Sequence, residues 1–166
     1  MNRRTILIIT AFLVLVAGWY LFRPERLFVN ARVNEGLPEA GSSANKSATA
    51  SSMTLADGRF HDGAHKTSGT ATIHQLSDGK RVLRLTNFET SNGPDVRVYL
   101  VAAEDAKDND TVTRAGFLEL GSLKGNIGDQ NYELPADTDL SKYHAVTIWC
   151  KRFSVNFGTA PLVARS

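Results

Sequence analysis

The sequence predicts an all-β domain, either an antiparallel β-sandwich or a flattened barrel, preceded by one N-terminal transmembrane helix. Three observations predict this class. An uncharged apolar run occupies residues 5–22, a stretch rich in Ser, Ala and Gly follows, and beyond it short segments alternate apolar and polar residues between Gly, Asp, Asn and Pro. We therefore expect a membrane anchor at 1–22, a flexible tether at 23–52 and a β domain at 53–166.

The apolar run, TILIITAFLVLVAGWYLF, is long enough to cross a bilayer. As a helix its eighteen residues rise roughly 27 Å, close to the thickness of the hydrocarbon core. Trp19 and Tyr20 lie at its end, where aromatic side chains favour the membrane interface. A cleaved signal peptide is the alternative, but the weak cleavage motif Val16-Ala17-Gly18 is followed by further apolar residues. The sequence therefore favours an uncleaved signal-anchor.

The charges beside the apolar run predict its orientation. Arg3 and Arg4 favour a cytoplasmic N-terminus, although Arg23 and Arg26 on the other side partly oppose this. The long polar remainder would be translocated largely regardless of these charges. The expected location is the cell membrane, single-pass, with the N-terminus cytoplasmic and the C-terminal domain extracytoplasmic.

The distribution of charge argues against nucleic acid as a partner. Residues 1–53 hold six basic and three acidic side chains, whereas residues 54–166 hold thirteen and fourteen. The β domain is thus near neutral and has no basic stripe of the kind that binds phosphates. Within the tether, residues 36–52 are small and polar with little to bury, so they cannot offset the entropy of becoming ordered.

In the β domain the clearest element is a hairpin. The segments GTATIHQL (69–76) and RVLRLTNF (81–88) both alternate, and SDGK joins them. DVRVYLVAA (95–103) follows the turn SNGP, and the shorter segments are FLELGSL, NYELP, AVTIWC and FSVNFG. No window of helical length keeps a 3.6-residue period, and DTDLSKY (137–143) indicates a single turn. About eight strands in roughly 110 residues are typical of a sandwich or barrel.

Two polar motifs have alternative interpretations. GNIGDQNY (125–132) has the Gly-x-x-Gly spacing of a phosphate loop, but the strand-like YELP after it favours a β-turn. The acidic run 108–110 lies in a polar stretch. Solvated loop charges are expected there rather than a calcium site, because the spacing of an EF-hand is absent.

The single cysteine, Cys150, lies in AVTIWCKRFSVNFG. In a strand it shares one face with Val146 and Ile148, which predicts that it is buried as a small hydrophobe. The apolar residues after it have the opposite parity. This change predicts a bulge or corner near Lys151-Arg152.

Three roles for Cys150 stay open: an inert core residue, a functional thiol or metal ligand, and an intermolecular disulfide. An unpaired cysteine in an exported protein meets oxidants, which argues against an incidental role. Lys151 and Arg152 beside it would lower the pKa of an accessible thiol.

The histidines give a weak signal. His61 and His65 are four residues apart but lie among glycines, so a helix that would put both on one metal-binding face is not expected. Exposed loop histidines are the main interpretation, and His74 is expected to face solvent. If the fold brought His65 to Cys150, the pair could ligate haem or copper, or act as base and nucleophile.

Four segments together resemble a known family: GRFHDGAHKTSGTATI, RLTNFETSNGPDVRVYL, LGSLKGNIGDQNYELP and VTIWCKRFSVNFGTAPL. In this order they are similar to the DM-thirteen domain, a module of Skeletor-type animal proteins and small bacterial membrane proteins. The resemblance covers residues 55–162. Its most specific parts are Asn92-Gly93-Pro94-Asp95 and the Trp-Cys-x-x-Phe-x-x-x-Phe-Gly run at 149–158.

The resemblance implies a β-rich extracytoplasmic module, in a family often found beside DOMON and cytochrome-b-type domains. It also implies a proposed role in electron transfer through one cysteine, which maps onto Cys150. Because this chain has only an anchor and no such partner domain, a relay would need a second membrane redox protein. The expected function is a membrane-anchored redox or electron-transfer accessory. A non-catalytic cell-surface module with a buried cysteine is the alternative, and the cofactor is unknown.

Overall fold

The computed structural model describes residues 2–22, 29–38 and 52–165. Its first element is helix α1 (Arg3–Phe22). The stretch Arg3–Tyr20 is long and apolar enough to cross a membrane, and none of it is buried against the rest of the molecule. Length and composition are the grounds for considering it a membrane span.

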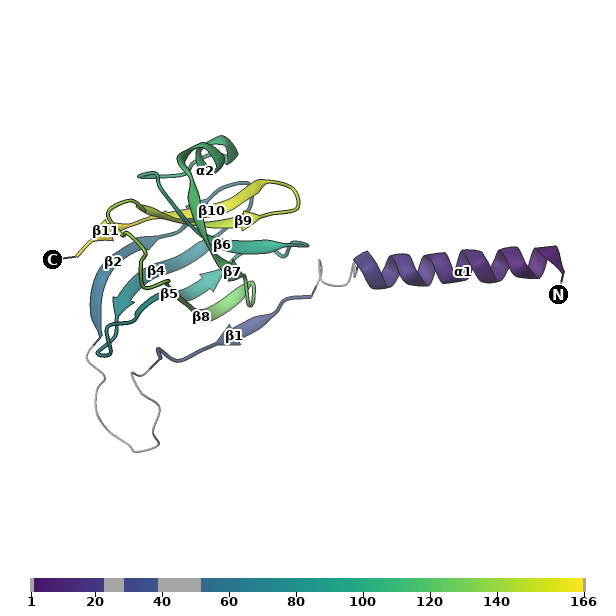
Figure 1. Ribbon diagram of the computed structural model, residues 1–166, viewed down its shortest axis with the longest axis horizontal. Coiled ribbons are helices and arrows are strands. Elements are labelled where there is room, and N and C mark those ends of the chain that lie inside the picture. Colours follow the sequence, from purple (N-terminus) through teal and green to yellow (C-terminus); the bar gives the residue numbers. More distant parts are fainter. Residues whose placement is uncertain (1, 23–28, 39–51, 166) are drawn as a thin grey trace, which may run out of the picture.

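The rest of the described chain folds as two sheets packed face to face (Figure 1), which confirms the predicted β-sandwich. The six-stranded sheet has the order β1-β8-β5-β4-β2-β11, and the five-stranded sheet has the order β3-β10-β9-β6-β7. The first comprises β1 (Arg32–Asn34), β8 (Ile127–Glu133), β5 (Arg81–Glu89), β4 (Ser68–Gln75), β2 (Met53–Arg59) and β11 (Val163–Ala164). The second comprises β3 (His61–Asp62), β10 (Val155–Pro161), β9 (Ala145–Cys150), β6 (Val96–Val101) and β7 (Phe117–Ser122).

Alternation along the strands explains the core between the sheets. On the five-stranded sheet Val98, Leu100 and Ile148 point inward and are fully buried, and Leu83 and Leu85 of β5 face them from the other sheet. The predicted hairpin is β4–β5, whose turn is closed by the Leu76 amide and the Lys80 carbonyl at 2.8 Å.

A short helix, α2 (Asn109–Ala115), was not predicted, and the acidic run assigned to a solvated loop begins it. The Asp108 side chain caps the helix by accepting a hydrogen bond from the Thr111 amide, and Gly116 follows its end. These are ordinary helix start and stop signals, but seven residues are too few to show a 3.6-residue period. Val112 of α2 packs with Trp149 and Tyr99 in a smaller cluster on the outer face of the five-stranded sheet.

Part of the stretch expected to be a tether is a strand. Strand β1 pairs in parallel with β8, in contrast to the antiparallel pairing of every other strand pair in the described residues. The Glu35 carboxylate then receives hydrogen bonds from Lys124 at 2.8 Å and from the Asn131 amide at 2.8 Å. Residues 39–51 lie outside the described residues, so for them the tether stays a prediction.

Two further local predictions are only partly correct. No helix follows the Gly-x-x-Gly spacing of GNIGDQNY, in agreement with the rejection of a phosphate loop, but the expected β-turn is wrong, because residues 127–133 form strand β8. Residues 137–143 take part in two turns, at 136–137 and 140–142, instead of the single turn expected.

Candidate functional site around Cys150

Cys150 ends strand β9 and lies in the core between the two sheets. It has no solvent-exposed surface and shares the inner face with Val146 and Ile148, as the alternation predicted. Its register partners are Val96 on β6 and Val155 on β10. The thiol therefore lies between two valines in an apolar environment.

The change of parity after Cys150 has two causes. Residues Lys151–Ser154 form a turn that joins β9 to β10, so the chain reverses where a bulge or corner was expected. Ser154 takes a positive φ of 53° in this turn. A β-bulge follows between Asn156 and Gly158, which lets Phe157 point into the core.

His65 lies in the connection between β3 and β4 and is half-buried. Its ring packs on that of Phe157, with 3.9 Å between the centroids. No hydrogen bond joins it to Cys150 in the part of the chain that the structure describes. Of the other histidines, His74 is half-buried rather than fully solvent-facing, with Nδ1 3.5 Å from the Thr54 hydroxyl.

The surroundings of Cys150 do not fit a blue-copper site. Copper centres that contain a cysteine use two further imidazole ligands. The register neighbours of Cys150 are Val96 and Val155, and no cluster of three or more His, Cys, Asp or Glu side chains that could hold a metal occurs among the described residues.

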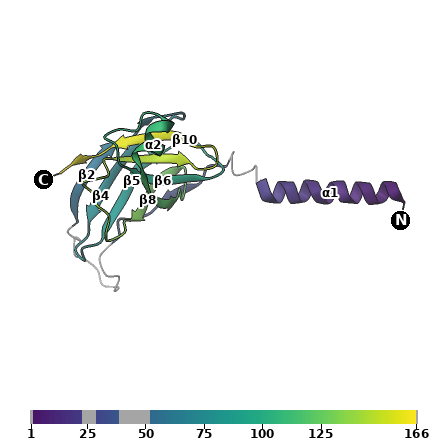
Figure 2. The same cartoon turned by 45° about the horizontal axis from the view of Figure 1, so that its top comes forward.

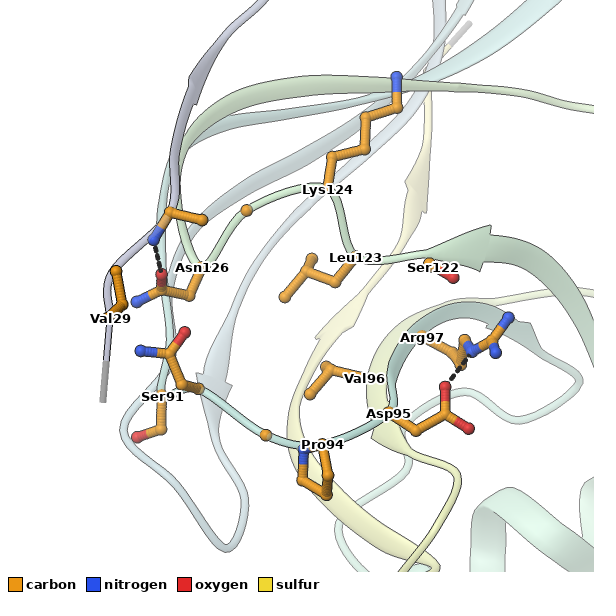
Figure 3. Close-up of a pocket in the computed structure, with 14 residues that line it drawn as sticks. Val29, Ser91, Pro94, Asp95, Val96, Arg97, Ser122, Leu123, Lys124 and Asn126 are labelled. Atoms are coloured by element: carbon orange, nitrogen blue, oxygen red, sulfur yellow. Dashed lines mark hydrogen bonds and ion pairs between the residues drawn. The ribbon is translucent and has the colours of Figure 1, made fainter. Parts of the chain in front are cut away.

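A groove of about 710 Å³ is lined in part by Val96, the register partner of Cys150 (Figure 3). Its two long walls are the segments 91–97 and 122–126, and Val29 and Ala31 border it. The side chains of Val96 and Leu123 line its floor, whereas Lys124 points away from it. Cys150 does not line the groove, but its register partner Val96 does.

Gly93 forms the lip of this groove. A Cβ atom at position 93 would lie 2.7 Å from Val96 Cγ2 and 3.0 Å from Phe157 Cζ. The absence of a side chain therefore lets the segment 91–95 lie directly on Val96 and Phe157, which belong to the same core cluster as Cys150. This explains one glycine of the Asn-Gly-Pro-Asp motif.

Two buried amides hold the groove walls in place. The Gln130 side chain bonds both polar groups of Gly125, accepting from its amide at 3.3 Å and donating to its carbonyl at 2.9 Å. The Asn126 side chain accepts from the Ala31 amide at 2.8 Å and donates to the Thr90 carbonyl at 3.1 Å. Neither residue stands out in the sequence, because the composition of a polar segment does not show which of its side-chain amides are buried.

The phenol of Tyr132 supports the same wall. Its hydroxyl donates to Gln130 Oε1 at 2.8 Å, and burial raises the pKa of Tyr132 far above its ordinary value. The hydroxyl thus keeps its proton at neutral pH and can act as the donor to Gln130.

On the far side of the five-stranded sheet, His61 joins β3 to the connection after β6. Its Nε2 lies 2.8 Å from Asp105 Oδ1, and its Nδ1 lies 3.0 Å from the Asp62 carbonyl oxygen. Burial alone would lower the pKa of His61, but the hydrogen bond to Asp105, with that to Asp62, raises it above its ordinary value. Only the protonated ring can donate to both acceptors.

We expect His61→Gln to destabilise the protein more at low pH than at high pH. Because the folded pKa is raised, the stabilisation is complete below the unfolded value of about 6.5 and is lost as the pH rises through the folded value. The pair is partly exposed, so the effect is small and weakens with salt. Thermal melts of both proteins between pH 5 and 9 measure it, with Asp105→Asn as the matched variant. A constant difference across this range would contradict the assignment.

A family model described as "Electron transfer DM13" matches residues 59–162. Comparison with curated proteins and with solved structures found no match. The matched range runs from the end of β2 to the residue before β11 and includes Cys150, His65 and both long walls of the groove. It covers more than half of the chain, so the protein belongs to the electron transfer DM13 family.

Proposed function

We propose that this protein is a membrane-anchored extracytoplasmic module that takes part in electron transfer, with Cys150 as its redox group. The observation that carries the proposal is the match to a family described by electron transfer. The apolar helix α1 supports the anchor, and the oxidising compartment that an exported domain would enter supports a role for an unpaired thiol. A second membrane redox protein would act as the partner.

In this proposal the partner reaches the thiol through the groove. Val96, the register partner of Cys150, lines the groove, and Gly93 lets the segment 91–95 lie close against Val96. A thiol reacts as the thiolate and needs access, so a movement of this segment must precede chemistry at Cys150. His65 has a positioning role here, since its ring packs on Phe157 in the same region.

A second function is favoured by a specific observation. Cys150 is fully buried among apolar side chains, and a cysteine in such surroundings is ordinarily inert. In this case the chain is a non-catalytic surface module, and the groove rather than the thiol would bind the partner.

Replacement of Cys150 distinguishes the two functions. If the thiol is the redox group, the native protein should react slowly but measurably with a small alkylating agent, and Cys150→Ala should abolish electron transfer to the partner while the fold is kept. Cys150→Ser should melt lower than Cys150→Ala in either case. Burying a hydroxyl without a partner costs about 1–3 kcal/mol.

The reference for the alkylation rate is a Cys150→Ala protein that carries Ser77→Cys, because Ser77 is exposed in the β4–β5 turn. Two results together would exclude the redox role: Cys150 is alkylated only in the presence of denaturant, and Cys150→Ala still transfers electrons. The surface module would then be the remaining function.

A further inference from the structure

The turn between β9 and β10 carries an exposed aromatic residue beside two basic ones. Phe153 is 65% exposed, and Lys151 and Arg152 precede it in the same turn. Lys151 pairs with Glu119 at 3.0 Å, whereas Arg152 has no ion-pair partner among the described residues. A single exposed aromatic side chain is ordinary, so its meaning depends on where the turn lies.

The turn lies at one end of the sandwich, which we call the hairpin end. It comprises the connections 29–31, 63–67, 90–95, 123–126 and 151–154. Hydrogen bonds that join them are Lys151 N to Asp95 O (2.8 Å), Asn126 Nδ2 to Thr90 O (3.1 Å) and Ala31 N to Asn126 Oδ1 (2.8 Å). Gly63 N donates to Phe157 O of β10 (3.0 Å), which ties the connection 63–67 to the same end. Figures 1 and 2 show the β9–β10 turn at the end of the sandwich opposite the β4–β5 turn.

The hairpin end is also where the chain arrives from α1. The helix ends at Phe22, and Asn30 already contacts the domain by accepting hydrogen bonds from the side chains of Asn92 and Asn126. The seven Cα–Cα steps from Phe22 to Val29 can span at most about 25 Å. The other end of the sandwich lies farther away by the length of a strand, about 30 Å for the nine residues of β5.

The two ends differ in charge. The connections of the hairpin end contain four basic side chains and one acidic one: Lys66, Lys124, Lys151, Arg152 and Asp95. The connections 76–80 and 134–144 at the other end contain three acidic and two basic ones: Asp78, Asp137, Asp139, Lys80 and Lys142. Lys124 and Lys151 are paired with the carboxylates of Glu35 and Glu119, which lie outside these connections, whereas Lys66 and Arg152 have no ion-pair partner among the described residues. The two unpaired basic side chains make the end tied to α1 the one that a negatively charged surface attracts.

We propose that the hairpin end rests on the lipid bilayer that holds α1, with the Phe153 ring at the level of the headgroups and Arg152 beside the lipid phosphates. The inference depends on the proposed membrane anchor. Aromatic rings favour this interface, and basic side chains are attracted to an anionic leaflet. Val29, 63% exposed, meets the same surface. The contact puts the groove over Val96 and Cys150 beside the membrane, within reach of a membrane-embedded partner.

Nitroxide labels on the full chain in vesicles test the contact. In a Cys150→Ala background, single cysteines are introduced by Ser154→Cys next to Phe153, by Ser77→Cys at the other end and by Val14→Cys in α1. Vesicles are made of phosphatidylcholine with and without phosphatidylglycerol, and the labels are relaxed by oxygen, which enters lipid, or by a nickel chelate, which stays in water. We expect the labels at 14 and 154 to favour oxygen and the label at 77 to favour nickel.

Phe153→Ser in the Ser154→Cys protein should shift that label towards nickel, and omitting phosphatidylglycerol should shift it in the same direction. If the label at 154 is as accessible to nickel as the label at 77, while the label at 14 is in lipid, the membrane contact is wrong and the anchor stands. A label at 14 that favours nickel overturns the anchor together with the contact. A label at 154 shielded from both reagents would assign the surface to a second copy of the chain and also overturn the proposal.

Discussion

Phe157→Ala is expected to lower the free energy of unfolding by about 3–5 kcal/mol, a large share of the stability of a small domain. Phe157 is 3% exposed and fills the core below Gly93. Its backbone carbonyl accepts hydrogen bonds from the Gly63 amide and the Thr67 hydroxyl, both at 3.0 Å, and these are kept in the variant. The decrease in the free energy of unfolding therefore comes from the missing ring and the cavity that it leaves.

The matched control for this change is Phe153→Ala, four positions earlier in the same hairpin. Phe153 is 65% exposed, so its removal should change stability by less than about 0.5 kcal/mol. Urea unfolding of the full chain in detergent micelles measures both variants. Similar losses from the two would mean that the bulge does not turn Phe157 into the core.

The second large effect is expected from Gly128→Ala, which should detach β1 from β8. Gly128 has a φ of 102°, and a Cβ atom there would lie 2.0 Å from the Val33 carbonyl oxygen. The positive φ alone costs about 1 kcal/mol or more for alanine. The backbone of β1 must move in addition, and it takes the Glu35 contacts with it.

Gly79→Ala is the control that separates the cost of the positive φ from the cost of the clash with β1. Gly79 also has a positive φ, of 84°, but no atom lies within 4 Å of its Cβ position. Gly128→Ala should be the more destabilising change. It should also speed hydrogen exchange at the Glu35 amide, which donates to the Asp129 carbonyl at 2.9 Å in the native protein. Equal losses and a protected Glu35 amide would contradict the close pairing of β1 with β8.

The elements that the sequence predicted correctly have strong local signals. Strict alternation places Val146, Ile148 and Cys150 on one face, and the residues of the SDGK turn identify the β4–β5 hairpin. Helix α2 was missed because its signal is a cap, Asp108, rather than a period. Strand β1 was missed because three residues of an edge strand, RVN, carry almost no alternation.

The sequence predicted which residue is central to the candidate site, Cys150, but not the groove near it. The burial of Cys150 follows from its parity, whereas the groove depends on contacts between residues distant in sequence, such as Asn126 with Ala31. Whether His65 lies beside Cys150 could not be judged from the sequence either. The position of the His65 ring depends on the bulge that turns Phe157 inward, since the two rings pack on each other.

The parallel pairing of β1 has a consequence for aggregation. Without β1, strand β8 would be the edge of the six-stranded sheet and would present unpaired amides and carbonyls to other chains. β1 covers that edge, and its own outer side is blunted by its length of three residues. The segment that continues from α1 thus also protects the sheet from edge-to-edge association, and a chain cut between β1 and β2 would lose this protection once β1 dissociated.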